Sequence, residues 1–274
     1  MTMRQVTYDS YLRPNHIPHI WCPGCGHGIS LKATIRAVDA MGWNNDEVSM
    51  ISGIGCSARA PGYADFNTLH TTHGRGIAFA TGVKLANPSL NVIVITGDGD
   101  GIAIGGNHLI HAARRNLDLN VVLFNNYIYG MTGGQVSPTT PLGCKATTAP
   151  FGNFEHAFNI AELVAAAGGN FVARGTVYHA TQLEKLLSAA FQKVGFSFVE
   201  VMSPCPTAFG RRNNLRGAIS MMHDLKDRAI PVVRARKMSA DELTGKIVTG
   251  VLLDRNLEEY SAIYNRNVRK LKGA

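Results

Sequence analysis

The sequence predicts an α/β fold built on a doubly wound, mainly parallel sheet. Short apolar runs rich in β-branched residues alternate with longer segments of helical periodicity, and the runs show no polar alternation. Strands of this kind are typical of parallel sheets that helices cover on both faces. With 274 residues, 45% of them hydrophobic, the chain is long enough to bury a large core.

The elements follow in order along the chain. Apolar runs predict strands at residues 48–52, 92–96, 121–124 and 196–202. Helical spacing predicts helices at residues 29–41, 76–86, 106–115, 154–167 and 181–194. The strand signal fades after residue 210. We therefore expect residues 1–210 to form a binding domain and residues 211–274 a basic, helical C-terminal extension.

Composition and charge exclude several classes of protein. No apolar run approaches the ~18 residues of a membrane span, and the first residues lack the apolar core of a signal peptide. We therefore expect a cytoplasmic protein without a membrane partner. The net charge is +8, of which residues 211–274 carry +7. A nucleic-acid binder more often spreads such charge over a face with interleaved aromatics, so no nucleic-acid partner is expected.

The basic C-terminal segment has two interpretations. It is either a solvated surface or a docking surface for an acidic partner or an anionic cofactor. Five cysteines are too few for a disulfide scaffold in a chain of this length, and their number is odd. Thiols that serve metal binding or redox chemistry are the better interpretation.

Four unusual segments follow directly after the predicted strands. They are Gly53-Ile54-Gly55-Cys56, Gly97-Asp98-Gly99-Asp100-Gly101, Asn125-Asn126 and Ser203-Pro204-Cys205-Pro206. In open parallel sheets, ligands bind beyond the carboxyl ends of the strands. We therefore expect these four segments to meet at one edge of the sheet and to form the binding site.

The glycine-rich segment after residue 96 indicates a phosphate site that contains a cation. Glycines let the backbone approach a phosphate closely, but an aspartate there would repel it unless a cation lies between them. Magnesium commonly bridges protein oxygens to phosphates, and an amide oxygen from the next strand end would complete its site. Asp98 and Asn126 are the preferred ligands, with Asp100 and Asn125 as the alternatives.

This arrangement resembles the thiamine-diphosphate motif, carried here by TGDGDGIAIGGNHL and LFNNYIYGMTGGQ. The resemblance implies that Asp98, the side-chain carbonyl of Asn126 and the main-chain carbonyl of Ile128 bind Mg2+. It also implies a thiamine-diphosphate site formed by these three residues together with Gly55, Cys56, Gly97, Gly99, Asp100, Tyr129, Gly130, Met131 and Thr132.

The spacing of the cysteines is compatible with three kinds of site. Cys22 and Cys25 form a CxxC pair that suits a thiol–disulfide motif or half of a zinc site. Cys56 and Cys205 each follow a strand into the same crevice, and four thiolates there would suit a [4Fe–4S] cluster. The neighbouring thiamine site favours the cluster, because electrons left by decarboxylation of a 2-oxo acid require a one-electron acceptor and zinc has no redox chemistry.

Residues 17–210 as a whole resemble the β subunit of a 2-oxoacid:ferredoxin oxidoreductase, most closely the 2-oxoglutarate type. The resemblance is carried by WCPGCGHG, SGIGCSARAPGY, HTTHGRGIAFATGVKLA, GDGDGIAIGGNHL, NNYIYGMTGGQ and SPCPT. It implies that Cys22, Cys25, Cys56 and Cys205 hold the cluster and that His27 lies near the cofactor. Cys144 lies outside this set.

Other polar residues have weaker assignments. Arg59 and Lys145 are candidates for holding a substrate carboxylate, and His70 and His73 are assigned to a polar loop without a metal.

The same resemblance implies CoA-dependent oxidative decarboxylation of a 2-oxo acid, with 2-oxoglutarate to succinyl-CoA and CO2 preferred and ferredoxin as the electron acceptor. The reaction could also run as a carboxylation. A partner α subunit would supply the pyrimidine-facing module in a doubled αβ heterodimer. Pyruvate and branched-chain 2-oxo acids stay open as substrates. More distant alternatives are a non-redox thiamine-diphosphate subunit and a thiol–disulfide or zinc module that uses Cys22 and Cys25.

Overall fold

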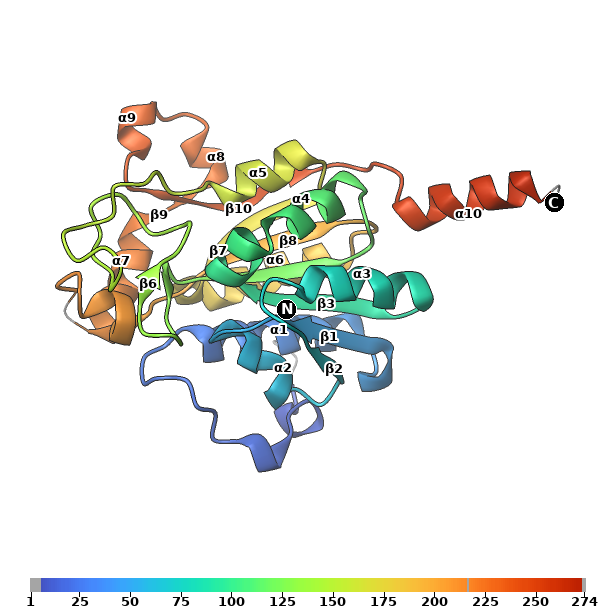
Figure 1. Cartoon of the computed structure of the whole chain (residues 1–274), viewed down its shortest axis with the longest axis horizontal. Coiled ribbons are helices and arrows are strands. Elements are labelled where there is room, and N and C mark those ends of the chain that lie inside the picture. The colour runs from blue at the N-terminus through green and yellow to red at the C-terminus, as the bar shows by residue number, and fades with distance from the viewer. Residues whose placement is uncertain (1–5, 216, 273–274) are drawn as a thin grey trace.

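The core of the protein is an eight-stranded sheet with the strand order β2-β1-β3-β4-β8-β7-β10-β9 (Figure 1). The structure is a computed structural model that describes residues 6–215 and 217–272. The β7–β10 pair is antiparallel and the other neighbouring pairs are parallel, which confirms the predicted sheet. The strands are β1 Val48–Ser52, β2 Asn67–His70, β3 Asn91–Gly97, β4 Asn120–Asn125, β7 Phe171–Thr176, β8 Ser197–Met202, β9 Ala229–Pro231 and β10 Ile247–Asp254, with a separate hairpin of β5 Ile128–Tyr129 and β6 Gln135–Val136.

Helices cover both faces of the sheet. The α-helices are α1 His27–Met41, α2 Ala60–Tyr63, α3 Gly76–Ala86, α4 Gly106–Arg114, α5 Ile160–Ala167, α6 Ala180–Phe191, α7 Ala218–Arg228, α8 Val232–Ala235, α9 Ala240–Leu243 and α10 Tyr260–Leu271. Two π-helical turns, η5 Gly99–Ile104 and η7 Pro206–Gly210, follow β3 and β8. Within the described residues, no helix is both long enough and apolar enough to cross a membrane.

Burial on both faces explains why the strands read as continuous apolar runs. In β3, Ile93 and Ile95 pack in one core cluster together with side chains of α1 and α6. Val92 and Val94 pack in the opposite cluster with side chains of α3, α4 and α5. Both sets of alternate side chains are removed from water, so a polar residue would be costly at either position.

The predicted elements before residue 210 are present, with shifts at their ends. The largest shift is in the predicted helix 154–167, since α5 begins only at Ile160. The predictions missed β7, whose sequence FVARGT contains a charge and a glycine in place of an apolar run. Arg174 of β7 lies in register with Glu200 of β8 and forms an ion pair with it at 2.6 Å, so its charge is compensated inside the sheet.

The C-terminal segment is not purely helical, and the prediction of a helical extension was incomplete. β10 pairs antiparallel with β7, and β9 pairs with β10 at the edge of the sheet. Residues 247–254 therefore continue the sheet of the preceding segment, and the strand signal was weakened there by a central glycine, Gly250. Only α10 projects away from the body, where it carries no buried residues (Figure 1).

Candidate active site

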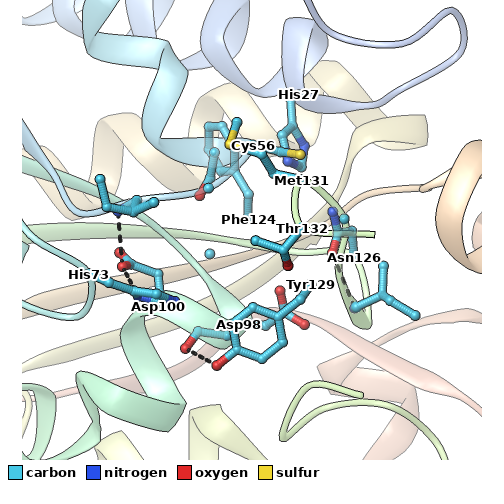
Figure 2. Close-up of a pocket in the computed structure, with 17 residues that line it drawn as sticks. His27, Cys56, His73, Asp98, Asp100, Phe124, Asn126, Tyr129, Met131 and Thr132 are labelled. Atoms are coloured by element: carbon cyan, nitrogen blue, oxygen red, sulfur yellow. Dashed lines mark hydrogen bonds and ion pairs between the residues drawn. The ribbon is translucent and has the colours of Figure 1, made fainter. Parts of the chain in front are cut away.

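The four segments that follow β1, β3, β4 and β8 meet at one edge of the sheet, as expected from the parallel topology. The segments after β1, β3 and β4 line a cavity that we call the glycine-loop cavity (Figure 2), and the segment after β8 lines a second cavity that shares residues with it. Every residue predicted to contact the cofactor lines it: His27, Gly55, Cys56, Gly97, Asp98, Gly99, Asp100, Asn126, Ile128, Tyr129, Gly130, Met131 and Thr132. The sequence had not assigned the other lining residues, Ile54, Ser57, His73 and Phe124, to the cofactor site.

Asp98 is a buried carboxylate at the end of β3. Its Oδ2 accepts hydrogen bonds from Ser137 Oγ at 2.5 Å and from Thr139 Oγ1 at 2.7 Å. Burial raises the pKa of Asp98 to about 6, and the two hydroxyls oppose that rise. The carboxyl is therefore ionised at neutral pH, and its orientation is fixed by two side chains from the segment after β6.

Asp100 is engaged differently, which separates the two aspartates that the sequence left as alternatives. Its oxygens accept hydrogen bonds from Thr96 Oγ1, the Ile54 and Gly74 amides, and the ring of His73. Donors from the protein therefore surround this carboxylate. Asp98, in contrast, accepts hydrogen bonds from two side-chain hydroxyls, both at Oδ2.

Asn125 and Asn126 are separated in the same way. Asn125 donates to Glu200 Oε1 at 2.7 Å, and its Oδ1 accepts from the Tyr127 amide at 3.1 Å, so it belongs to the buried network under the cavity. Asn126 lines the cavity, and its Oδ1 accepts from the Ile128 amide at 3.3 Å. Tyr127, between Asn126 and Ile128, adopts a left-handed φ of 67°, which marks a sharp turn at this strand end.

His27 begins α1 and forms another part of the cavity wall. It is fully buried, with its ring centroid 5.2 Å from that of Phe124 and Nδ1 3.3 Å from Ser203 Oγ. Burial lowers the pKa of His27 to about 4, so the imidazole is neutral at pH 7. A neutral imidazole can donate one hydrogen bond and accept another at this position.

A second cavity, which we call the cysteine cavity, is lined by all four of the predicted cluster ligands, Cys22, Cys25, Cys56 and Cys205. The thiols of Cys25 and Cys56 have their pKa raised by burial, to about 12 and about 11, and neighbouring cysteines add to both shifts. These thiols therefore affect one another electrostatically although their sequence positions are far apart. In the described part of the chain, no three His, Cys, Asp or Glu side chains form a compact site for a single metal ion.

The two cavities share a wall formed by Cys56, Asn126, Gly130 and Met131. At Gly130 a Cβ atom would lie 3.4 Å from Cys56 Sγ and 3.7 Å from Cys205 Sγ. Because residue 130 is a glycine, no side chain of this residue lies between the two cavities. Groups bound in the two cavities would be separated by little more than this turn.

Comparison with known proteins decides the family. Residues 53–201 match the family of thiamine pyrophosphate enzymes at their C-terminal TPP-binding domain. The 2-oxoglutarate synthase subunit KorB of Methanothermobacter marburgensis is 52% identical over 254 residues, which cover 93% of this chain and 89% of the relative. The same subunit of Methanocaldococcus jannaschii is 49% identical over 262 residues, with 96% and 97% covered.

A solved structure agrees with these relatives. The 2-oxoglutarate:ferredoxin oxidoreductase from Magnetococcus marinus, with 2-oxoglutarate, coenzyme A and succinyl-CoA bound, matches with a TM-score of 0.88 and 33% identity. The match covers all of this chain and 93% of that one. The chain belongs to the 2-oxoacid:ferredoxin oxidoreductase β subunits. This membership confirms the resemblance.

Two residues proposed for substrate binding differ in position within this β subunit. Arg59 lines the cysteine cavity, and its buried Nε has no hydrogen-bond partner in the described structure. Lys145 is exposed, lines neither cavity, and exchanges backbone hydrogen bonds with the Asn213 side chain. Cys144 does not line the cysteine cavity and instead lines a separate cavity with Tyr127.

Three residues, Ser137, Thr139 and His73, had not been assigned to the candidate site from the sequence. Ser137 and Thr139 orient Asp98, although their segment shows no periodicity that would have placed them near β3. His73 had been assigned to a polar loop, but it lines the glycine-loop cavity and its Nδ1 lies 2.8 Å from Asp100 Oδ1. The signal for His73 was its place shortly after β2, where the chain returns to the ends of the strands.

Proposed function

We propose that this chain is the β subunit of a 2-oxoglutarate:ferredoxin oxidoreductase that forms succinyl-CoA and CO2 from 2-oxoglutarate and CoA. The observation that carries the proposal is the wall shared by the two cavities, which would keep a thiamine cofactor and a one-electron carrier within transfer distance. Support for the substrates comes from the relatives named for 2-oxoglutarate and from the similar structure with 2-oxoglutarate and coenzyme A bound.

The glycine-loop cavity fits a diphosphate bridged by Mg2+. Asp98 would provide a carboxylate, Asn126 its side-chain carbonyl and Ile128 its main-chain carbonyl, all oxygen donors that Mg2+ prefers. Bound there, thiamine diphosphate would supply the electron sink for decarboxylation of the 2-oxo acid. Ser137 and Thr139 hold the Asp98 carboxylate in place, and the buried ring of His27 forms part of the cavity wall.

The cysteine cavity fits a [4Fe–4S] cluster held by Cys22, Cys25, Cys56 and Cys205. Four thiols from three separate segments face one cavity, and such a ligand set is typical of this cluster. The cluster would supply one-electron transfer toward ferredoxin. Because burial disfavours the thiolate forms, iron binding to these residues should release protons and should weaken at low pH.

The β-subunit assignment implies a partner subunit, and we propose an α subunit that faces the aminopyrimidine of the cofactor in a doubled αβ assembly. Ferredoxin in the cytoplasm is the proposed electron acceptor. Arg211 is an exposed basic residue just after the turn η7 that carries part of the cysteine cavity, so it would favour an acidic partner there.

The decisive experiment is a substrate panel on the co-expressed αβ complex, purified without oxygen. We expect 2-oxoglutarate with CoA to reduce a one-electron dye faster than pyruvate or branched-chain 2-oxo acids do, and the isolated β subunit to be inactive. Analysis of the same preparation should find iron, sulfide and thiamine diphosphate. A complex that lacks iron and sulfide, or that prefers pyruvate, would contradict the corresponding part of the proposal.

A further inference from the structure

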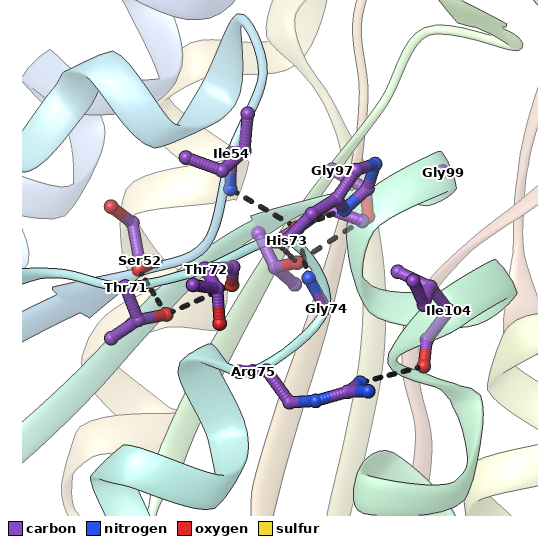
Figure 3. Close-up of polar contacts among 12 residues, drawn as sticks. Ser52, Ile54, Thr71, Thr72, His73, Gly74, Arg75, Gly97, Gly99 and Ile104 are labelled. Carbon is purple, nitrogen blue, oxygen red and sulfur yellow. Dashed lines mark hydrogen bonds and ion pairs between the residues drawn. The ribbon is translucent and has the colours of Figure 1, made fainter.

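Asp100 is a buried carboxylate, 4% exposed, that collects hydrogen bonds from three separate segments. Its Oδ1 accepts from the Gly74 amide at 2.7 Å and the Ile54 amide at 3.1 Å, and it lies 2.8 Å from His73 Nδ1. Its Oδ2 accepts from Thr96 Oγ1 at 2.7 Å. Figure 2 shows Asp100 joined to His73, and Figure 3 shows Ile54, His73 and Gly74 converging beside the loop that starts at Gly97.

The three segments that meet at Asp100 belong to different parts of the site. The backbone of Asp100 itself is part of the glycine loop after β3. Ile54 lies two residues before Cys56, which faces the cysteine cavity. His73 lies in the turn before α3 and faces the glycine-loop cavity. One carboxylate therefore fixes both the loop that would hold the diphosphate and the loop that carries a cluster ligand.

The packing around Asp100 leaves these loops little freedom to move independently. A Cβ atom at Gly53 would lie 2.3 Å from both carboxylate oxygens of Asp100, so a larger residue there would push the two loops apart. His73 is held in addition against the ring of Tyr129, with centroids 5.8 Å apart. The Tyr129 hydroxyl donates to the Gly99 carbonyl at 2.9 Å, which closes the network back onto the glycine loop.

We propose that Asp100 is a positioning residue that couples the two cavities, so that binding at the glycine loop orders the Cys56 loop and cluster binding orders the glycine loop. The proposal rests on the proposed function, because it needs both cofactors. Coupling of this kind is reciprocal. The factor by which cluster loading raises the affinity for thiamine diphosphate must equal the factor by which thiamine diphosphate raises the affinity for the cluster.

The test compares the affinity of the αβ complex for thiamine diphosphate, measured by calorimetry with saturating Mg2+, before and after cluster loading. We expect loading to tighten the cofactor by about fivefold or more in the natural protein. Asp100→Ala should reduce this ratio to about one, whereas Asp100→Asn, which keeps an acceptor for the Ile54 and Gly74 amides, should keep most of it. Asp118→Asn is the matched control, because Asp118 also binds a backbone amide, that of Gly195, and a cation, Lys84, but lies outside both cavities.

A second measurement needs no variant. Hydrogen exchange of the Ile54 amide in the cluster-loaded complex should slow when thiamine diphosphate and Mg2+ are added. Unchanged exchange, or an equal affinity ratio in the natural protein and Asp100→Ala, would overturn the coupling alone. Failure of the natural complex to bind either cofactor would instead overturn the proposed function, and the coupling with it.

Discussion

The glycine-loop cavity and the cysteine cavity adjoin, yet the chain completes them to different degrees. Around the first, buried carboxylates already have their partners: Asp98 is held by two hydroxyls, and Glu200 by Arg174 and Asn125. Around the second, the four cysteines are free, and burial disfavours the ionised forms of Cys25, Cys56 and Cys205. Folding thus supplies the carboxylates with hydrogen-bond partners, whereas burial disfavours the thiolate forms that binding of the proposed cluster would require of Cys25, Cys56 and Cys205.

The largest expected effect concerns the sulfur ligands. Cys205→Ser should remove one ligand of the cluster, so that dye reduction by the αβ complex falls to background and its iron content drops, while the melting temperature of the metal-free chain changes little. Cys144→Ser is the control, because Cys144 lines a different cavity, and it should keep its iron and its activity. Full iron content in Cys205→Ser would refute the ligand assignment.

Asp98→Asn should have opposite effects on function and stability. Burial raises the pKa of Asp98 from 3.8 to about 6, so the folded chain binds this proton more tightly than the unfolded chain does. The corresponding stability is present below about pH 4 and lost as the pH rises through about 6, with an amplitude of roughly 3 kcal/mol.

We therefore expect Asp98→Asn to raise the melting temperature of the cofactor-free chain above about pH 7 and to leave it unchanged below about pH 4. The affinity for thiamine diphosphate with Mg2+ should fall on the order of 100-fold, since a charged oxygen ligand is lost. Thermal unfolding over this pH range and calorimetry check the two effects. A variant that is less stable than the natural chain at high pH would contradict the burial argument.

Arg174→Met should destabilise the fold without touching either cavity wall directly. Arg174 and Glu200 have side chains only 14% and 3% exposed, and breaking a buried pair leaves an uncompensated charge that costs about 3–5 kcal/mol. Denaturant unfolding measures this loss. Arg36→Met is the matched control, because the Arg36–Glu184 pair is more exposed and its loss should cost about 1 kcal/mol or less.

The smallest expected effect is that of Thr139→Val, which removes one hydrogen bond to Asp98 at nearly constant volume. We expect the affinity for thiamine diphosphate with Mg2+ to fall about tenfold, as is typical when a residue that orients a metal ligand is lost. Thr139→Ser keeps the hydroxyl and should keep the affinity. Equal affinities for the two variants would show that Asp98 is held without this bond.

The elements predicted from the sequence are those whose own residues form a recognisable hydrophobic pattern. The elements that were missed depend on contacts with other strands. The apolar runs of β1, β3, β4 and β8 are visible because both of their faces are buried. β7 was missed because its Arg174 is compensated by Glu200 of β8, a contact that no local pattern reveals. Residues 247–254 were missed because Gly250 interrupts their apolar run.

The same distinction holds for the site. The strand-end positions of Asp98, Asn126, Cys56 and Cys205 followed from the topology, because parallel strands end at one edge. The choice between Asp98 and Asp100 did not follow from the topology, because both residues follow the same strand. Only the hydrogen-bond donors around each carboxylate distinguish the two. Thr139 lies 41 residues from Asp98, and its contribution is visible only in the folded chain.

The two outer strands limit how this subunit can assemble. β2 has four residues, and β9 has three, one of which is a proline that lacks an N–H donor. Short edge strands, one of which lacks a backbone N–H donor, are poor templates for pairing with a strand of another polypeptide. Strand addition, the usual route to fibrous aggregates, is therefore disfavoured at both borders of the sheet.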